Sequence, residues 1–359
     1  MLEQLGRRPR RAWRGRTRYR YLAVTAALLA QLAILVAPAL ANPGVPSSVF
    51  DRNSVDWDFV YNRTSSQFAA DFAQRTSQGM MIVDVEVNDF SDRLGKADDH
   101  PNYYSAVWQR DVDGRAWQEW RDMTRSQFTQ KHQQALVDNQ RLVDFEAYTC
   151  DSDNGKECYA GVWVENREHL STSFGALMYD RSESDVQVFI ENNRAIGMMP
   201  IDLEEYNVPG CSRCFAVIIA QNVEHLDWRA HWSLSSADFA AKFNQYRDAG
   251  FRMLAVTSHA RYDCPPLIGC TFGENQAWSV YAGIWVENRN GRGWAEYRNM
   301  STDFEQKRRD FIAAGYRPIA FEEYKVFDKK VCEDIPLSDI NFCGNRYVMR
   351  YAMIWRQNT

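Results

Sequence analysis

One sequence unit recurs five times between residue 57 and the last residue of the chain. Its clearest marker is an aromatic-Ala-x-x-Trp strand, which reads YSAVW at 104–108, YAGVWVEN at 159–166, FAVIIAQN at 215–222, YAGIWVEN at 281–288 and YAMIWRQN at 351–358. A second marker precedes this strand and consists of an apolar residue with Gly or Asn eleven positions later. These pairs are Phe68/Gly79, Phe128/Asn139, Val186/Gly197, Phe239/Gly250 and Phe304/Gly315. Equal spacing at five places is the signature of a repeat protein.

The fifth copy shows which elements the unit contains. Residues 294–300 alternate large and polar side chains, as a strand does. Ser301 then supplies an N-cap oxygen for a helix, and Gly315 ends that helix as a residue with positive φ. Residues 319–324 begin a hairpin that returns through the Trp strand. We therefore predict an α+β repeat protein of five strand–helix–strand–strand units with antiparallel sheets.

These units define the expected organisation of the chain. The predicted segments are a secretory signal at 1–41, a lead-in at 42–56, and repeats at 57–111, 112–168, 169–224, 225–290 and 291–359.

The N-terminal segment has the composition of a secretory signal. Residues 1–20 contain eight Arg and one Glu, and an apolar run follows at 22–41. Pro38 and the small residues Ala39 and Ala41 predict cleavage before Asn42. The alternative is an uncleaved anchor, because the run reaches the ~20 residues that span a bilayer. We expect cleavage and an extracellular location.

Charge restricts the partners of the mature protein. The whole chain has 42 basic and 47 acidic residues, so removing eight Arg and one Glu leaves a net charge of −12 for residues 42–359. Such a chain repels phosphates instead of releasing their counterions. We expect no nucleic-acid partner, and no membrane contact once the signal is removed.

The eight cysteines form four local pairs, each within the loop of one hairpin. An oxidising compartment and the close approach of facing hairpin residues favour one disulfide per loop. A redox or zinc role for the CxxC at 211–214 is the weaker alternative, because no second ligand pair accompanies it. The predicted disulfides are Cys150–Cys158, Cys211–Cys214, Cys264–Cys270 and Cys332–Cys343.

Aromatic residues that recur in the repeats are expected in the core. Trp57, Trp117, Trp228 and Trp294 hold one repeat position, and Trp108, Trp163, Trp285 and Trp355 hold another. Hairpin length, in contrast, varies from 8 residues between Tyr206 and Phe215 to 26 between Tyr324 and Tyr351. Repeat proteins usually bind partners through such variable loops. Trp278 and Phe327, which lie in the long loops and break the pattern, are therefore the candidate binding residues.

Two polar sets also recur. Glu86, Glu146, Glu204 and Glu322 hold one strand position, where they have either a structural role or line an acidic surface or cation site. Asn166, Asn222, Asn288 and Asn358 follow the Trp strand, and we expect them to serve turn chemistry.

The motifs YAGIWVEN, Trp-x-x-Tyr, Ser-Thr-x-Phe and GYRPI-x-x-EEY resemble the bacterial tandem repeat domain, and the resemblance covers residues 57–359. That module is similar to the N-terminal repeats of fungal polyglycine hydrolases, which are secreted serine peptidases with a separate catalytic domain. The third copy departs from the pattern, with Ile219 in place of Trp and Phe215 in place of Tyr. The resemblance implies a repeat architecture and no defined activity for the repeat itself.

Motifs for catalysis are absent from the sequence. It contains no Ser-x-x-Lys, G-x-S-x-G, H-E-x-x-H or P-loop motif, and adjacent glutamates such as Glu204/Glu205 point to opposite faces of a strand. We therefore predict a non-catalytic module without cofactor or metal that binds an extracellular protein or polysaccharide. The alternative is a secreted hydrolase, or the accessory domain of one, related to polyglycine hydrolases.

The ends of the array lead to one further expectation. The Trp-x-x-Tyr strand is predicted to pair with the hairpin of the preceding unit, since consecutive strands usually neighbour one another. The strand at 57–63 would then lack a partner unless the array closes into a ring by pairing it with 346–356. We expect such closure, with the first and last repeats in contact.

Overall fold

The computed structural model describes residues 55–89, 102–150, 156–167, 176–208, 211–262, 277–334 and 341–358. The predicted signal at 1–41 and most of the lead-in lie outside these residues. All of the described residues belong to one unit of the chain, residues 46–359.

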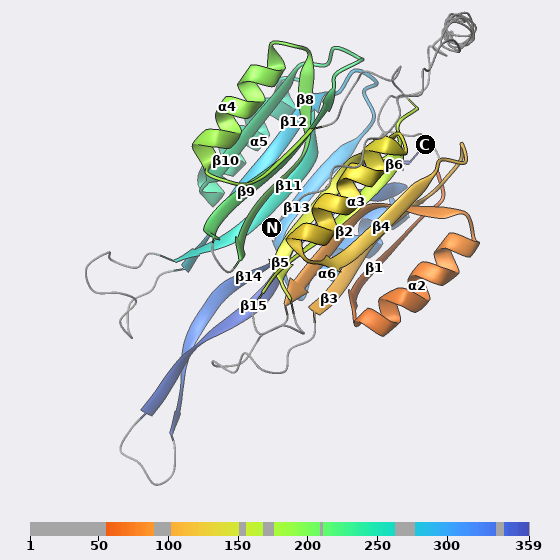
Figure 1. Ribbon diagram of the computed structural model, residues 1–359. Helices are drawn as coiled ribbons and strands as arrows, with labels where there is room; N and C mark the ends of the chain where they lie inside the picture. The colour runs from red at the N-terminus through yellow and green to blue at the C-terminus, as the bar shows by residue number, and fades with distance from the viewer. Residues whose placement is uncertain are drawn as a thin grey trace, which may run out of the picture. The chain divides into compact units, whose positions relative to one another are not determined.

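The strand–helix–strand–strand order occurs five times, as predicted (Figure 1). The first three repeats are β1 (Trp57–Arg63), α2 (Ser65–Ser77), β2 (Met80–Asp89), β3 (Asn102–Arg110); β4 (Trp117–Met123), α3 (Arg125–Val137), β5 (Gln140–Thr149), β6 (Glu157–Glu165); and β7 (Ala176–Arg181), α4 (Glu183–Arg194), β8 (Met198–Val208), β9 (Cys211–Gln221). The last two are β10 (Trp228–Leu234), α5 (Ser236–Asp248), β11 (Phe251–Tyr262), β12 (Ala277–Glu287); and β13 (Trp294–Met300), α6 (Phe304–Ala313), β14 (Tyr316–Asp334), β15 (Asn341–Gln357).

Each repeat forms its own three-stranded antiparallel sheet. The orders are β1-β3-β2, β4-β6-β5, β7-β9-β8, β10-β12-β11 and β13-β15-β14. We call β1, β4, β7, β10 and β13 the outer strands, β2, β5, β8, β11 and β14 the inner strands, and the remaining five the middle strands. The expected pairing of an outer strand with the preceding hairpin is wrong. Because a helix connects the outer strand to the inner strand, these two strands run in the same direction. The middle strand lies between them and pairs antiparallel with both.

Polar side chains start most of the helices. Thr64, Thr124 and Ser182 form capping boxes, and Ser235 accepts a hydrogen bond from the Asp238 amide. The fifth helix differs from the prediction because it begins at Phe304, and the Asp303 carboxylate accepts from the Ser301 amide at 2.9 Å instead. In the described part of the chain, no helix combines the length and apolar character that a membrane span requires.

The prediction that recurrent tryptophans are core residues is confirmed for the middle strands, whereas Trp57, Trp117 and Trp294 on the outer strands are only partly buried and pack against the core. Trp108, Trp163, Trp285 and Trp355 on the middle strands are all fully buried. The outer-strand tryptophans pack on the helix of the preceding repeat. The Trp117 ring lies 5.6 Å from that of Phe72, and the Trp294 ring lies 5.2 Å from that of Phe243. Each repeat therefore buries apolar surface against its neighbour, as solenoid and propeller units do.

Two of the recurrent asparagines, Asn222 and Asn358, link one repeat to the next through the same pair of hydrogen bonds. Asn222 donates to the Leu226 carbonyl at 2.7 Å and accepts from the Leu226 amide at 2.9 Å. Leu226 lies two residues before the first outer-strand residue of the fourth repeat. Asn358 makes the same two bonds with Val55, at 2.9 and 3.1 Å, and Val55 lies two residues before Trp57. The start of the first repeat therefore contacts the end of the fifth repeat. The start of the fourth repeat contacts the end of the third repeat in the same way.

Contacts also join the inner strands of successive repeats, and β14 of the fifth repeat contacts β2 of the first. The Phe321 amide donates to the Asp84 carboxylate at 3.0 Å, and the Phe59 ring lies 4.7 Å from that of Phe321. The contact expected between the first and last repeats is thus present. The strand pairing expected to produce it is wrong, because β1 pairs with β3 of its own repeat.

Candidate binding pocket at the ends of the inner strands

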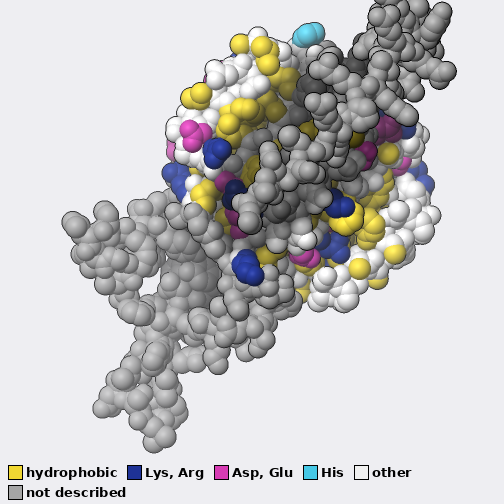
Figure 2. All heavy atoms as spheres, viewed as in Figure 1, with side chains coloured by type: hydrophobic (Ala, Val, Ile, Leu, Met, Phe, Trp, Pro, Cys, Tyr) yellow, Lys and Arg dark blue, Asp and Glu magenta, His cyan; other side chains and the backbone are white. Residues whose placement is uncertain are grey.

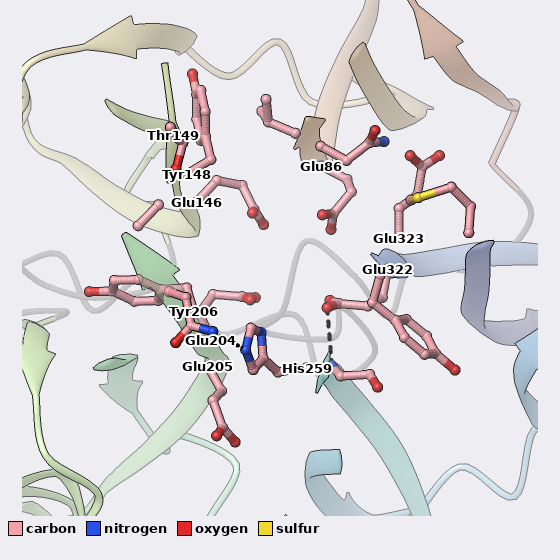
Figure 3. Close-up of a pocket in the computed structure, with 17 residues that line it drawn as sticks. Glu86, Glu146, Tyr148, Thr149, Glu204, Glu205, Tyr206, His259, Glu322 and Glu323 are labelled. Atoms are coloured by element: carbon pink, nitrogen blue, oxygen red, sulfur yellow. Dashed lines mark hydrogen bonds between the residues drawn. The ribbon is translucent and has the colours of Figure 1, made fainter. Parts of the chain in front are cut away.

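A bulge in every inner strand precedes the recurrent acidic residues. The register with the middle strand skips one residue in each repeat, namely Val83, Val143, Ile201, Leu254 and Ile319. A bulge bends its strand and changes the direction of the side chains that follow. Figure 3 shows Glu86, Glu146, Glu204 and Glu322, which lie three residues after the bulge, converging from four repeats toward one centre.

These glutamates line a pocket of about 270 Å³. The pocket lies at the end of the inner strands from which the hairpins project, and the long β14–β15 hairpin extends from this end (Figure 1). Its other lining residues are Val87, Asn88, Ala147, Tyr148, Thr149, Glu205, Tyr206, Asn207, Ser258, His259, Glu323, Tyr324 and Met349. Among the described residues that form its wall there is no lysine or arginine.

A layer of aspartates lies farther from the hairpins and has a structural role. Asp144 accepts from the Val85 amide at 2.9 Å, and Asp202 accepts from the Phe145 amide at 3.2 Å. Asp84 accepts from the Phe321 amide in the same way. Each aspartate therefore satisfies an edge amide of the preceding repeat, which strand pairing leaves free.

The glutamate layer contains one polar substitute, Thr257 of the fourth repeat. Its hydroxyl lies 3.1 Å from both Glu204 Oε2 and Glu322 Oε1, and Glu322 also accepts from the Ser258 amide at 3.0 Å. A hydroxyl has only one hydrogen to donate. One of the two glutamates must therefore be protonated if both contacts are hydrogen bonds.

Burial supplies the reason for such protonation. It raises the pKa of Glu86, Glu146 and Glu204 well above the ordinary range, and neighbouring carboxylates raise these pKa values further. Burial likewise raises the pKa of Glu322. In a low-dielectric site without a basic partner, converging carboxyl groups cannot all ionise. The pocket therefore favours protonated carboxyl groups, and a bound cation would favour their ionised forms.

The face of the described residues seen in Figure 2 carries lysine, arginine, aspartate and glutamate side chains interspersed with one another. Of these four residue types, glutamate alone occurs among the described residues that line the pocket. Within the described part of the chain, no group of three or more His, Cys, Asp or Glu has the arrangement of a metal site.

Two of the predicted disulfides lie at the rim of the pocket. Cys150 and Cys158 are bonded with a Cα separation of 5.3 Å, and Cys211 and Cys214 with 5.8 Å. Cys150 directly follows the lining residue Thr149, and Cys214 is the cross-strand partner of Tyr206. Cys332 and Cys343 are register partners in β14 and β15, but their side chains lie outside the described part, as do residues 264–270.

The other predicted residues are placed less completely. The expectation that Trp278 and Phe327 lie in loops is wrong, because they lie in the paired strands β12 and β14; their side chains fall outside the described part. Sequence reasoning singled out the recurrent glutamates but missed Asn88, His259, Glu205 and Glu323 as pocket residues. The signal for the first two was present, because Asn88 and His259 replace the tyrosine that other repeats carry as Tyr148, Tyr206 and Tyr324.

Comparison with known families agrees with this architecture. A family model described as polyglycine hydrolase-like structural repeat matches residues 54–111, 114–166, 225–288 and 291–358. No curated protein sequence gives a significant match. The third repeat, which has Phe215 and Ile219 in place of Tyr and Trp, lies outside the matched segments, yet it forms the same sheet and helix as the others. The chain therefore belongs to the family of polyglycine hydrolase-like structural repeats.

Proposed function

We propose that this chain is a secreted, non-catalytic repeat module that recognises an extracellular protein or polysaccharide through its hairpin face. The hairpin face consists of the pocket and the five hairpins that begin beside it. The observation that carries the proposal is the position of the pocket. Residues from all five repeats line it at the ends of the inner strands, so a ligand on the variable hairpins also reaches the acidic centre.

The positions of the two disulfides favour binding at the same hairpin face. Cys150–Cys158 and Cys211–Cys214 each close a short loop beside a lining residue. Closing loops this short restricts loop shape without linking one repeat to another. A preformed loop loses less conformational freedom on binding, which favours affinity.

Secretion is part of the proposal and has its own test. The basic and apolar composition of residues 1–41 and the disulfides favour export. Mass spectrometry of the protein from culture medium should find Asn42 at the N-terminus. A protein that retains residues 1–41 and stays with the cells contradicts secretion.

The binding test compares a variant at the hairpin end of the inner strands with control variants at the opposite end. Residues 42–359 are screened by pull-down and on glycan arrays, beside a variant in which a short turn replaces residues 329–346. Val137→Arg and Ile196→Arg serve as controls, because these exposed residues lie just before inner strands, at the end opposite the hairpins. We expect the shortened hairpin to weaken binding at least about tenfold, which is ~1.4 kcal/mol, and the controls to leave it unchanged. The other four hairpins are shortened in the same way, and binding that is indifferent to all five hairpins refutes the proposal.

The family description favours one alternative, an accessory domain of a hydrolase or a hydrolase itself. Incubation of the purified protein with glycine-rich peptides and cell-wall polymers separates these functions. Sustained turnover that a serine-directed inhibitor abolishes supports the hydrolase and contradicts a non-catalytic module.

A further inference from the structure

The tyrosine that completes the sheets of the second, third and fifth repeats is absent from the first and the fourth, which has His259 in its place. In the second and third repeats, the Tyr148 and Tyr206 hydroxyls accept from outer-strand amides at 2.7 and 2.8 Å, and Tyr324 does so in the fifth repeat at 2.9 Å. The first repeat has Asn88 at this position. There the corresponding amide, that of Asn62, donates to the Ser105 hydroxyl at 3.1 Å. Asn88 is therefore released from the structural role of its counterparts.

The Asn88 side chain lines the pocket without a partner. The residue is 6% exposed, and within the described part of the chain neither its amide nitrogen nor its amide oxygen has a hydrogen-bond partner. Leaving buried polar atoms unsatisfied is unfavourable, so native proteins rarely retain them without a reason. A ligand group that hydrogen-bonds to Asn88 would satisfy these atoms.

Glu323 places a second polar group on the same side of the pocket, and its ionised form, which a bound cation favours, offers an unused acceptor. Its Oε1 atom accepts from the Ser105 hydroxyl at 2.8 Å, whereas its Oε2 atom is buried and has no partner among the residues that the structure describes. Ser105 is the cross-strand partner of Glu86, which lies two residues before Asn88 on β2. Figure 3 shows Glu86 and Glu323 on the same side of the pocket. This side, between the first and fifth repeats, thus offers mainly oxygen acceptors.

We propose that the side of the pocket formed by Glu86, Asn88 and Glu323 binds the ammonium group of a lysine side chain from a protein partner. The inference deepens the proposed binding function and rests on it. An ammonium group has three donors and matches separate acceptors, whereas a guanidinium pairs best with both oxygens of one carboxylate. Among the described contacts, Ser105 occupies one oxygen of Glu323, which leaves the other for a single donor.

The order of residues along the pocket wall favours a ligand whose charged group follows an aliphatic chain. Tyr148, Tyr206, Tyr324 and Met349 line the part nearer the hairpins, and the glutamates lie farther in along the strands. A lysine side chain buries its methylene groups along apolar surface and presents its charge at the tip. An amino sugar carries its amine directly on a polar ring and fits this order of surfaces less well.

Calorimetric titration of the folded protein, residues 42–359, with Nα-acetyl-lysine amide tests the inference. Nα-acetyl-norleucine amide has the same kind of stem without the charge, and glucosamine represents amino sugars. We expect lysine amide to bind at least about tenfold more tightly than either. Equal binding of the norleucine probe, tighter binding of glucosamine, or no binding of the lysine probe overturns the proposal.

Variants locate the site. We expect Glu323→Gln to weaken binding of the lysine probe by about 10- to 100-fold, the range for a hydrogen bond to a charged group. Glu296→Gln is the matched control, because Glu296 is a buried carboxylate of the same repeat that pairs with Arg298 outside the pocket. Asn88→Tyr restores the side chain found in three other repeats, so it should fold and block the probe.

Circular dichroism of each variant establishes that it is folded before titration. Unchanged affinity in both Glu323→Gln and Asn88→Tyr refutes this site. A partner that still depends on the hairpins in the pull-down would then leave the proposed function standing without the lysine site.

Discussion

The bond pair between Asn358 and Val55 gives the most informative single substitution. Asn358→Ala removes two partly buried hydrogen bonds that join the end of the fifth repeat to the start of the first. A hydrogen bond of this kind contributes about 0.5–1.5 kcal/mol, so the variant should lose about 1–3 kcal/mol of unfolding free energy. For a protein of roughly 300 residues this lowers the melting temperature by about 2–5 °C.

Asn222→Ala is the matched control. It removes the same two bonds, but to Leu226, which lies only four residues along the chain. Those bonds form whether or not the first repeat contacts the fifth. Urea unfolding followed by circular dichroism measures both variants, and we expect similar losses of stability. A clear loss in Asn222→Ala with no loss in Asn358→Ala refutes the contact between the terminal repeats.

Three further predictions follow from the described contacts. Burial raises the pKa of Glu323 to about 8, so folding favours the protonated form of this group. Its contribution to the unfolding free energy is complete below the ordinary pKa of about 4.5 and is lost as the pH rises toward 8. Urea unfolding should therefore show a smaller loss of stability between pH 5 and pH 8 in Glu323→Gln, and an equal loss contradicts this assignment. Gly283→Ala places a Cβ atom 2.9 Å from the Trp285 ring, so it should cost about 1–3 kcal/mol; an unchanged melting temperature counts against the packing described. Non-reducing peptide mapping should recover the two disulfides of the structure together with Cys264–Cys270 and Cys332–Cys343, and any bridge between repeats contradicts the local pairing.

The elements of the repeat could be predicted because their signals are local. A Ser or Thr at a helix start, a positive-φ residue such as Gly315 or Asn139 at its end, and a Trp in each middle strand all act within a few residues. The outer-strand partner could not be predicted in this way. Trp57–Arg63 shows the same alternation whether it pairs with its own hairpin or with another, and the path of the helix decides between them.

The sequence identified some of the pocket residues but could not show that they share one cavity. Glu86, Glu146, Glu204 and Glu322 recur at one position, but a recurring residue usually has a structural role. Only the convergence of the inner strands gives them a common cavity. Asn88 was detectable as the residue that breaks the tyrosine pattern, although its lack of partners needs coordinates.

The account depends most on the first and fifth repeats forming one wall of the pocket, and hydrogen exchange at the Phe321 amide tests this most directly. That amide donates to Asp84 of the first repeat, as the Phe145 amide donates to Asp202 within the continuous array. NMR-detected exchange should find the Phe321 amide protected to a similar degree as that of Phe145, with the protection lost in Asp84→Ala. Rapid exchange at Phe321 beside slow exchange at Phe145 would contradict the contact between the two repeats and, with it, the shared pocket.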